Sequence, residues 1–145
     1  MTTVGDMLKA KGSHVYSVQP ESSVYDALKL MADRNIGAVL VTGDNGLLVG
    51  ILSERDYARK VVLHGHTSRD TKVSAIMTTD VVHIPPDIPV DECMGLMTMR
   101  HIRHLPVVED GRPMAMVSIG DVGRALIENQ GFVIQQLEKY IHGVR

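Results

Sequence analysis

The sequence predicts an α/β protein, in the α+β sense. Two β-α-β-β-α repeats pack sheet to sheet as one pseudo-two-fold module, and a C-terminal amphipathic helix follows. The chain repeats itself, because residues 15–61 align with residues 81–126 with one residue lost in a turn. Within each copy, segments of helical apolar period alternate with short strand-like runs. One copy alone would leave a sheet face too small to be stable, so the two copies should share a core.

The first repeat, residues 1–63, is predicted to open with a short lead-in helix and an extended piece. A helix with one buried stripe follows, since apolar residues recur at helical spacing from Val24 to Met31. The runs 36–41 and 47–52 are apolar and flank a turn of Gly, Asp and Asn, which is typical of a hairpin. A second helix ends the repeat.

The second repeat, residues 73–130, predicts the same elements in the same order, with its buried helical stripe from Val90 to Met97. Residues 64–72 are polar and contain a glycine, so we interpret them as the linker between the repeats. Residues 131–145 carry apolar residues on one side and predict the added amphipathic helix.

Composition limits the partners and the compartment. Fifteen Lys and Arg against 17 Asp and Glu give a net charge of −2, so no overall field attracts nucleic acid or an anionic membrane. With four Tyr, one Phe and no Trp, there are few stacking platforms for single-stranded nucleic acid. No apolar run reaches the roughly 18 residues of a membrane span. The single cysteine, Cys93, suits a reducing compartment, so we expect a cytoplasmic protein.

Both copies place a Ser three residues before an Asp, directly after an apolar run: Ser53 with Asp56, and Ser118 with Asp121. One interpretation is a capping box, in which the Ser and the acidic residue satisfy backbone N–H groups at the start of a helix. The other is a ribose site, because a carboxylate accepts hydrogen bonds from both vicinal hydroxyls and a helix N-terminus favours a nearby anion. The two roles can coexist.

The paired units, the hairpin strands "AVLV" and "PVV", and the repeated Ser-x-x-Asp resemble a tandem cystathionine-β-synthase (CBS) domain pair, or Bateman module. The resemblance covers nearly the whole chain. It implies a regulatory module that binds an adenosyl ligand between the repeats: AMP, ADP, ATP, NAD or S-adenosylmethionine. In this family each binding cleft joins the Ser-x-x-Asp of one copy to the residues before the first hairpin strand of the other.

Carried over by position, the resemblance predicts two clefts that differ in charge. The first cleft would contain Ser53, Arg55, Asp56, Arg103 and His104, with Ile51 and Val82 as walls. The second would contain Ser118, Asp121, Gly37 and Ala38, with Tyr16 and Met116 as walls. Arginine grips phosphate in two-point contacts, and only the first cleft has arginines at these positions. We therefore expect the second cleft to bind a free nucleotide more weakly.

Other functions lack a signature. His101 with His104 and His64 with His66 have metal-compatible spacing, but neither pair has a third ligand nearby in the sequence, so we predict no metal site. No nucleophile elbow or phosphate loop occurs, which argues against an enzyme. We expect a nucleotide-sensing homodimer of CBS pairs that signals to an unknown effector protein. The alternative is a ligand-free, homo-oligomeric scaffold or partner-binding protein in which the Ser-x-x-Asp motifs are only helix caps.

Overall fold

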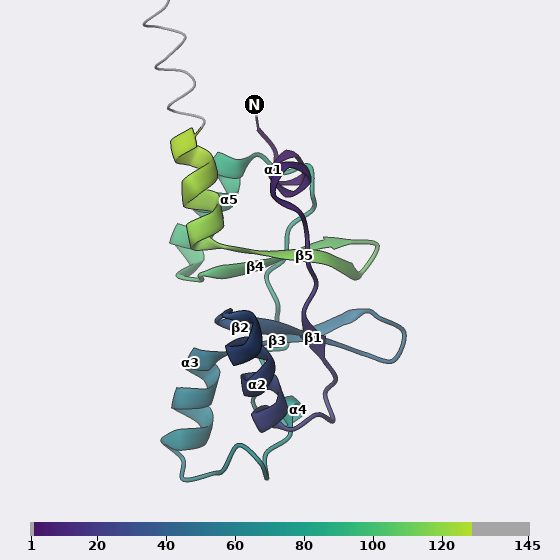
Figure 1. Cartoon of the computed structure of the whole chain (residues 1–145), viewed down its shortest axis with the longest axis vertical. Coiled ribbons are helices and arrows are strands. Elements are labelled where there is room, and N and C mark those ends of the chain that lie inside the picture. The colour runs from purple at the N-terminus through teal and green to yellow at the C-terminus, as the bar shows by residue number, and fades with distance from the viewer. Residues whose placement is uncertain (1, 129–145) are drawn as a thin grey trace, which may run out of the picture.

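The computed structural model describes residues 2–128 of the 145-residue chain. The predicted C-terminal helix at residues 131–145 lies outside these described residues. Within them, two small sheets are stacked along the long axis of the molecule, each covered by its own helices (Figure 1). This arrangement confirms the predicted mixed fold with two β-containing units.

The first sheet has the order β1-β2-β3. Its strands are β1 (Ser17–Val18), β2 (Ala38–Thr42) and β3 (Leu48–Ser53), with β1 parallel to β2 and β2 antiparallel to β3. The helix α2 (Val24–Arg34) lies between β1 and β2 in the chain. After β3 the chain forms the short helix α3 (Glu54–Tyr57), which continues as a π-helical segment, η1 (Ala58–Val62). The predicted hairpin is present, and so are the predicted helices that precede and follow it.

The second sheet pairs β4 (His104–Glu109) antiparallel to β5 (Arg112–Ser118). The helices α4 (Val73–Ile76) and α5 (Val90–Arg100) precede it, and residues 119–128 form a helix after it. In place of a counterpart to β1, a single parallel bridge joins Ile84 to Val107. The repeat is therefore visible in the backbone as well as in the sequence.

The main helix of each repeat ends in the same way. Both α2 and α5 bury one stripe, which holds Val24, Ala27 and Met31 in α2 and its counterparts in α5. Each helix then ends at a residue in the left-handed conformation, Asn35 at φ 54° and His101 at φ 55°. Because such a residue turns the chain sharply, the following segment enters the sheet directly.

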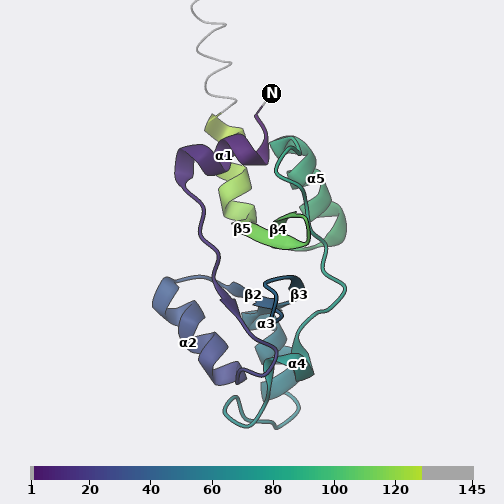
Figure 2. The same cartoon turned by 90° about the vertical axis from the view of Figure 1, so that its right-hand side faces the viewer.

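Each short lead-in helix packs in the core of the other repeat, not of the repeat that it precedes in the sequence. Val4 and Met7 of α1 (Val4–Lys11) pack in the core of the second repeat, and Val73 and Ile76 of α4 pack in the core of the first. The Val4 N–H donates to the Ile88 carbonyl at 2.9 Å, which fixes α1 on the second repeat. In Figure 2, α1 accordingly lies beside α5, while α4 lies at the opposite end near α3. Two chain segments therefore connect the repeats.

The two sheets pack against each other through alternate strand residues. In β2, Val39 and Val41 belong to the first core, so the fully buried Leu40 between them points to the other face, toward the second sheet. The hairpin turns are also joined, because the Leu48 N–H donates to the Gly111 carbonyl at 3.0 Å. Within residues 2–128, no helix is long and apolar enough to cross a membrane.

Candidate functional site

A cleft of about 520 Å³ opens between the two repeats. Its lining includes all seven residues assigned to the first cleft from the sequence: Ile51, Ser53, Arg55, Asp56, Val82, Arg103 and His104. Gly37 and Ala38, which were assigned to the second cleft, also line this one. Side chains of both repeats thus meet in one cleft, where the first repeat contributes Asp56 and Arg55, and the second contributes Asp80, Arg103 and two histidines.

The Ser53 and Asp56 side chains form a capping box at the start of α3. The Ser53 N–H donates to Asp56 Oδ2 at 2.9 Å, and the Asp56 N–H donates to Ser53 Oγ at 3.2 Å. The Ser53 hydroxyl also donates to Asp56 Oδ2, at 3.1 Å. The box forms because Ser53 is extended, so its hydroxyl faces the first turn of the helix. The capping interpretation is therefore right for this motif, and the same bonds hold the carboxylate in a fixed orientation.

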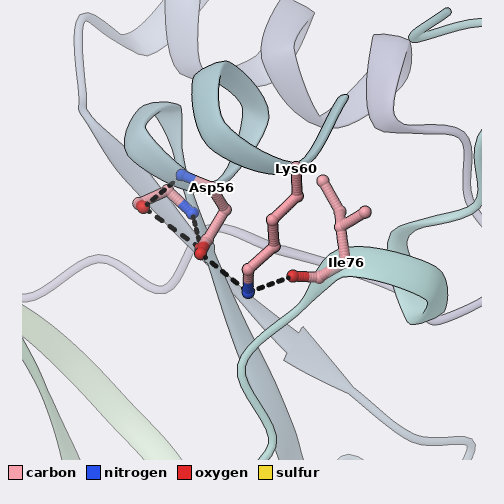
Figure 3. Close-up of polar contacts among 4 residues, drawn as sticks. Asp56, Lys60 and Ile76 are labelled. Carbon is pink, nitrogen blue, oxygen red and sulfur yellow. Dashed lines mark hydrogen bonds and ion pairs between the residues drawn. The ribbon is translucent and has the colours of Figure 1, made fainter. Parts of the chain in front are cut away.

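The other oxygen of the Asp56 carboxylate is paired with a lysine. Lys60 Nζ lies 3.1 Å from Asp56 Oδ1 and donates to the Ile76 carbonyl at 2.9 Å (Figure 3). The Asp56 side chain is 15% exposed and the Lys60 side chain 44% exposed. A carboxylate offers about four acceptor positions. The Ser53 N–H, the Ser53 hydroxyl and the lysine therefore leave some capacity for a ligand hydroxyl at the exposed edge.

The far wall of the cleft carries positive charge. Arg103 is exposed, and His104 is partly buried beside Gly37, where a Cβ atom added to Gly37 would lie 3.5 Å from the imidazole Cε1. Burial lowers the pKa of His104, and the neighbouring Arg103 charge lowers it further, while Asp121 and Glu54 act in the opposite direction. An anion in the cleft would therefore meet exposed arginines and an imidazole that its charge would help to protonate.

A protein-family model for the CBS domain matches residues 4–63 and 73–128. The chain belongs to the CBS-domain family. The mitochondrial CBS-domain protein CBSX3 of Arabidopsis thaliana is 40% identical over 98% of this chain and 73% of its own length. The chain spans only about a fifth of other Arabidopsis relatives, such as CBSCBSPB2, of which it covers 21%. CBS pairs of this kind are regulatory modules.

Solved structures of CBS-domain proteins have the same fold. One from Burkholderia ambifaria MC40-6 superimposes with a TM-score of 0.83 at 47% identity, over 89% of this chain and 96% of that one. The CBS pair of protein MJ0100, solved in complex with 5′-methylthioadenosine and S-adenosyl-L-methionine, gives a TM-score of 0.77 at 27% identity. It covers 89% of this chain and 98% of that one. That neighbour shows that a CBS pair of this shape can bind adenosyl compounds.

The second Ser-x-x-Asp of this CBS pair forms a similar cap in a different setting. The Ser118 N–H donates to Asp121 Oδ2 at 3.0 Å, and the Asp121 N–H donates to Ser118 Oγ at 3.1 Å. Arg124, one turn along the same helix, bonds Asp121 Oδ1 at 2.8 Å. Neither Ser118 nor Asp121 is among the residues that line the first cleft. The two motifs are thus alike locally and differ in what surrounds them.

The two predicted walls of the second cleft also lie outside the first. The Tyr16 ring stacks on His14 with centroids 5.9 Å apart, and the Arg34 guanidinium lies 5.2 Å from the Tyr16 centroid. Met116 is partly buried in β5, opposite Pro106 of β4. Tyr16 is therefore held by cationic and imidazole neighbours from the first repeat.

Sequence reasoning did not assign five other lining residues to the first cleft: Thr78, Asp80, Val81, His101 and Ile102. The first three belong to the segment between α4 and the second core. Thr78 pairs with Ile51 at the edge of β3, with hydrogen bonds of 2.9 and 3.0 Å in the two directions. Their proximity in sequence to Val82, and that of His101 and Ile102 to Arg103, was the signal that could have identified them.

The remaining reactive side chains lie elsewhere. Cys93 is a free thiol with no exposed surface in the second core, and burial raises its pKa to about 11. A thiol held in this form is a poor nucleophile, so we interpret Cys93 as a small core residue. Among residues 2–128, no three His, Cys, Asp or Glu side chains gather as a potential metal site.

Proposed function

We propose that this CBS pair is a sensor that binds an adenine nucleotide or a related adenosyl ligand in the first cleft: AMP, ADP, ATP, NAD or S-adenosylmethionine. One observation carries the proposal. The oriented carboxylate of Asp56 and the exposed guanidinium of Arg103 come from different repeats, and both line one cleft of about 520 Å³. A volume of this size is typical of small-molecule sites.

Each part of an adenosyl ligand has a complementary group in the lining. Ribose hydroxyls would donate to the exposed edge of the Asp56 carboxylate, and phosphate would bind Arg55, Arg103 and His104. The apolar side chains of Ile51 and Val82 would flank the adenine ring. The adenosyl complex of the MJ0100 CBS pair supports this ligand class.

The proposed output is a change in how the repeats are held together. Because both repeats contribute to the lining, a ligand in the cleft bridges them and favours the arrangement in which both sets of groups reach it. We propose that a homodimer of CBS pairs passes this change to a separate effector protein. The buried free thiol of Cys93 supports work in a reducing compartment such as the cytoplasm.

A specific observation also favours the second candidate, a ligand-free scaffold or partner-binding protein. The same Ser/Thr-x-x-Asp spacing provides an N-cap bond at Thr3 with Asp6 and at Ser23 with Asp26, and neither pair lines the first cleft. Capping alone is therefore a sufficient role for the motif at other places in this chain. The two candidates differ in whether Asp56 affects a ligand.

The test is isothermal titration of the wild type and Asp56→Ala with AMP, ATP, NAD and S-adenosylmethionine, with thermal melting alongside. Asp6→Ala is the matched control, because it removes a capping box of the same geometry outside the cleft. We expect Asp56→Ala to lose about 1 kcal/mol of stability with its cap. We also expect it to bind the ligand at least tenfold more weakly, since hydrogen bonds to a charged group contribute about 1.5–3 kcal/mol. Asp6→Ala should keep the wild-type affinity.

Either of two results would contradict the proposed ligand-sensing function. If the folded wild type binds none of the four compounds, or if Asp56→Ala and Asp6→Ala bind equally well, the carboxylate of Asp56 is a cap and the scaffold hypothesis replaces the sensor.

A further inference from the structure

Lys60 differs from the other cations near the first cleft because it bonds two separate elements. Its ammonium lies 3.1 Å from Asp56 Oδ1 on α3 and 2.9 Å from the carbonyl oxygen of Ile76, the last residue of α4 (Figure 3). Carbonyls at the end of a helix lack intrahelical partners and attract cations. Lys60 thus fills two acceptors at once, one in the candidate ribose site and one at the end of α4.

The end of α4 is where the chain leaves the first repeat for the second. Ile76 packs in the first core, and Ile84 packs in the second. Between them, Thr78 is paired to Ile51 on the edge of β3, and residues 78 and 80–82 line the cleft. A shift in the Ile76 carbonyl would therefore move both a wall of the cleft and a covalent connection between the repeats.

The helix that carries Lys60 is locally irregular. Residues 58–62 are π-helical, and the Leu63 N–H donates to the Ala58 carbonyl at 3.3 Å, five residues back. Short π-helical insertions are rare and occur often at functional sites. The corresponding helix of the second repeat is α-helical throughout its described residues, 119–128. The irregular turn is thus confined to the repeat whose carboxylate lies in the described cleft.

The second repeat lacks the same link. Aligning Ser53 with Ser118 places Ala125 opposite Lys60, and an alanine side chain cannot form either bond. Asp121 is instead paired with Arg124, which lies on its own helix. The link that Lys60 makes between the Asp56 carboxylate and α4 therefore has no equivalent at the matching position of the second repeat, Ala125.

We propose that Lys60 is a positioning residue that couples the Asp56 carboxylate to the segment 77–82, so that a ligand bound at Asp56 is sensed by the connection between the repeats. The inference rests on the proposed function, because it assumes a ligand that bonds Asp56. The Lys60 ammonium orients the Asp56 carboxylate, so a ribose hydroxyl that donates to the remaining acceptor position of Asp56 alters the contact between this carboxylate and Lys60, and the bond to Ile76 transmits the adjustment to α4. Binding at one carboxylate then alters the packing between the repeats.

The experiment compares Lys60→Met with Arg59→Met in the full chain. Both variants remove one positive charge from the same π-helical segment, and Lys60→Met keeps most of the aliphatic length of the side chain. Adenosine and AMP serve as the probes, with affinity measured by titration and amide hydrogen exchange measured over residues 77–82. Adenosine carries no phosphate, so a loss of its affinity reports on the ribose site rather than on the charge of the cleft.

We expect three results. In the wild type, ligand binding should slow amide exchange in residues 77–82. In Lys60→Met, this segment should exchange faster without ligand, adenosine affinity should fall about fivefold, and the ligand-induced protection should be lost. Arg59→Met should match the wild type, and Lys60→Arg, which keeps a cation with comparable reach, should restore part of the effect. Lys60→Gln replaces Lys60→Met if the methionine variant does not fold.

Two contrary outcomes are distinguishable. If the wild type binds neither probe nor any other adenosyl compound, the proposed function fails and the coupling fails with it. If the wild type binds and Lys60→Met matches Arg59→Met in affinity and exchange, only the coupling is overturned.

Discussion

The two Ser-x-x-Asp motifs are nearly identical within their own helices and unlike in their surroundings. The serine N–H to carboxylate distance is 2.9 Å at Ser53 and 3.0 Å at Ser118. Around them, the sequence substitutes glycine for arginine: Gly120 stands opposite Arg55, and Gly37 opposite Arg103. The cap is thus duplicated, while Arg55 and Arg103, which both line the first cleft, each have a glycine at the matching position of the other repeat.

This difference shows that a helix cap is a local property of the sequence, whereas a ligand site is not. A Ser or Thr three residues before an Asp bonds the Asp N–H at the starts of α1, α2 and α3, and also at Thr67 with Asp70. The spacing therefore predicts a cap, because a cap needs only the first turn of a helix. A ligand site needs groups from both repeats, so it depends on how the sheets pack. We therefore expect the largest loss of ligand affinity when the positive charge that the second repeat contributes to the cleft is removed.

The largest expected effect is at Arg103. Arg103→Ala removes an exposed guanidinium from the cleft wall, and hydrogen bonds to charged groups contribute about 1.5–3 kcal/mol. We therefore expect at least a tenfold loss of AMP affinity in isothermal titration and little change for adenosine, which has no phosphate. The first cleft would then resemble the predicted second cleft in lacking an arginine at this position.

Arg100→Ala provides the control, because Arg100 ends α5 and does not line the cleft. Equal losses of AMP affinity in Arg100→Ala and Arg103→Ala would mean that general charge, and not a contact in the cleft, attracts the nucleotide.

Much of the fold followed from the sequence because it rests on local patterns. The apolar stripe from Val24 to Met31, the two hairpins and both lead-in helices are each specified by a few neighbouring residues. Seven of the residues that line the first cleft followed from the family resemblance, which assigned Gly37 and Ala38 to the second cleft. Their positions in the chain alone could not show that Gly37 and Ala38 line the same cleft as Arg103.

What could not be predicted depends on contacts between distant segments. Nothing near Val4 in the sequence indicates that α1 packs on the second repeat, because that placement follows from which apolar face remains open after the sheets stack. Likewise, nothing in the sequence distinguishes Lys60 from the other lysines, and only the fold brings the Ile76 carbonyl within 2.9 Å of its ammonium. The π-helical turn at residues 58–62 also has no marker in the residue pattern.

A smaller effect is expected from adding charge to the second motif. A side chain at Gly120 has room, since its Cβ would meet only ordinary contacts at 3.7 Å from Arg124 and Ser118. Gly120→Arg supplies the cation that Arg55 provides in the first repeat. In an Arg103→Ala background, we expect it to raise AMP affinity about threefold by titration, a gain typical of an exposed charge pair of up to about 1 kcal/mol.

Gly120→Ala separates this charge from the effect of replacing a glycine in a helix, which by itself favours the helical state. If the alanine and arginine variants bind AMP equally, a cation at residue 120 does not convert the second motif into an AMP site.

The smallest expected effect is on the pH dependence of folding stability. It compares the two repeats without a ligand. Burial lowers the pKa of His104, with Arg103 adding to the shift and Asp121 and Glu54 opposing it. As pH falls below the ordinary value of 6.5, the unfolded chain therefore binds a proton at this site before the folded chain does, so stability declines. The counterpart in the first repeat is Ala38, which cannot titrate.

We expect His104→Asn to reduce the loss of urea stability between about pH 7.5 and 5.5, a window that spans the ordinary histidine pKa. His66→Asn, at an exposed linker position, should not reduce it. If the two variants keep the same pH slope as the wild type, the imidazole beside Gly37 is better hydrated than its burial indicates. The asymmetry between the clefts would then lie in the arginines alone.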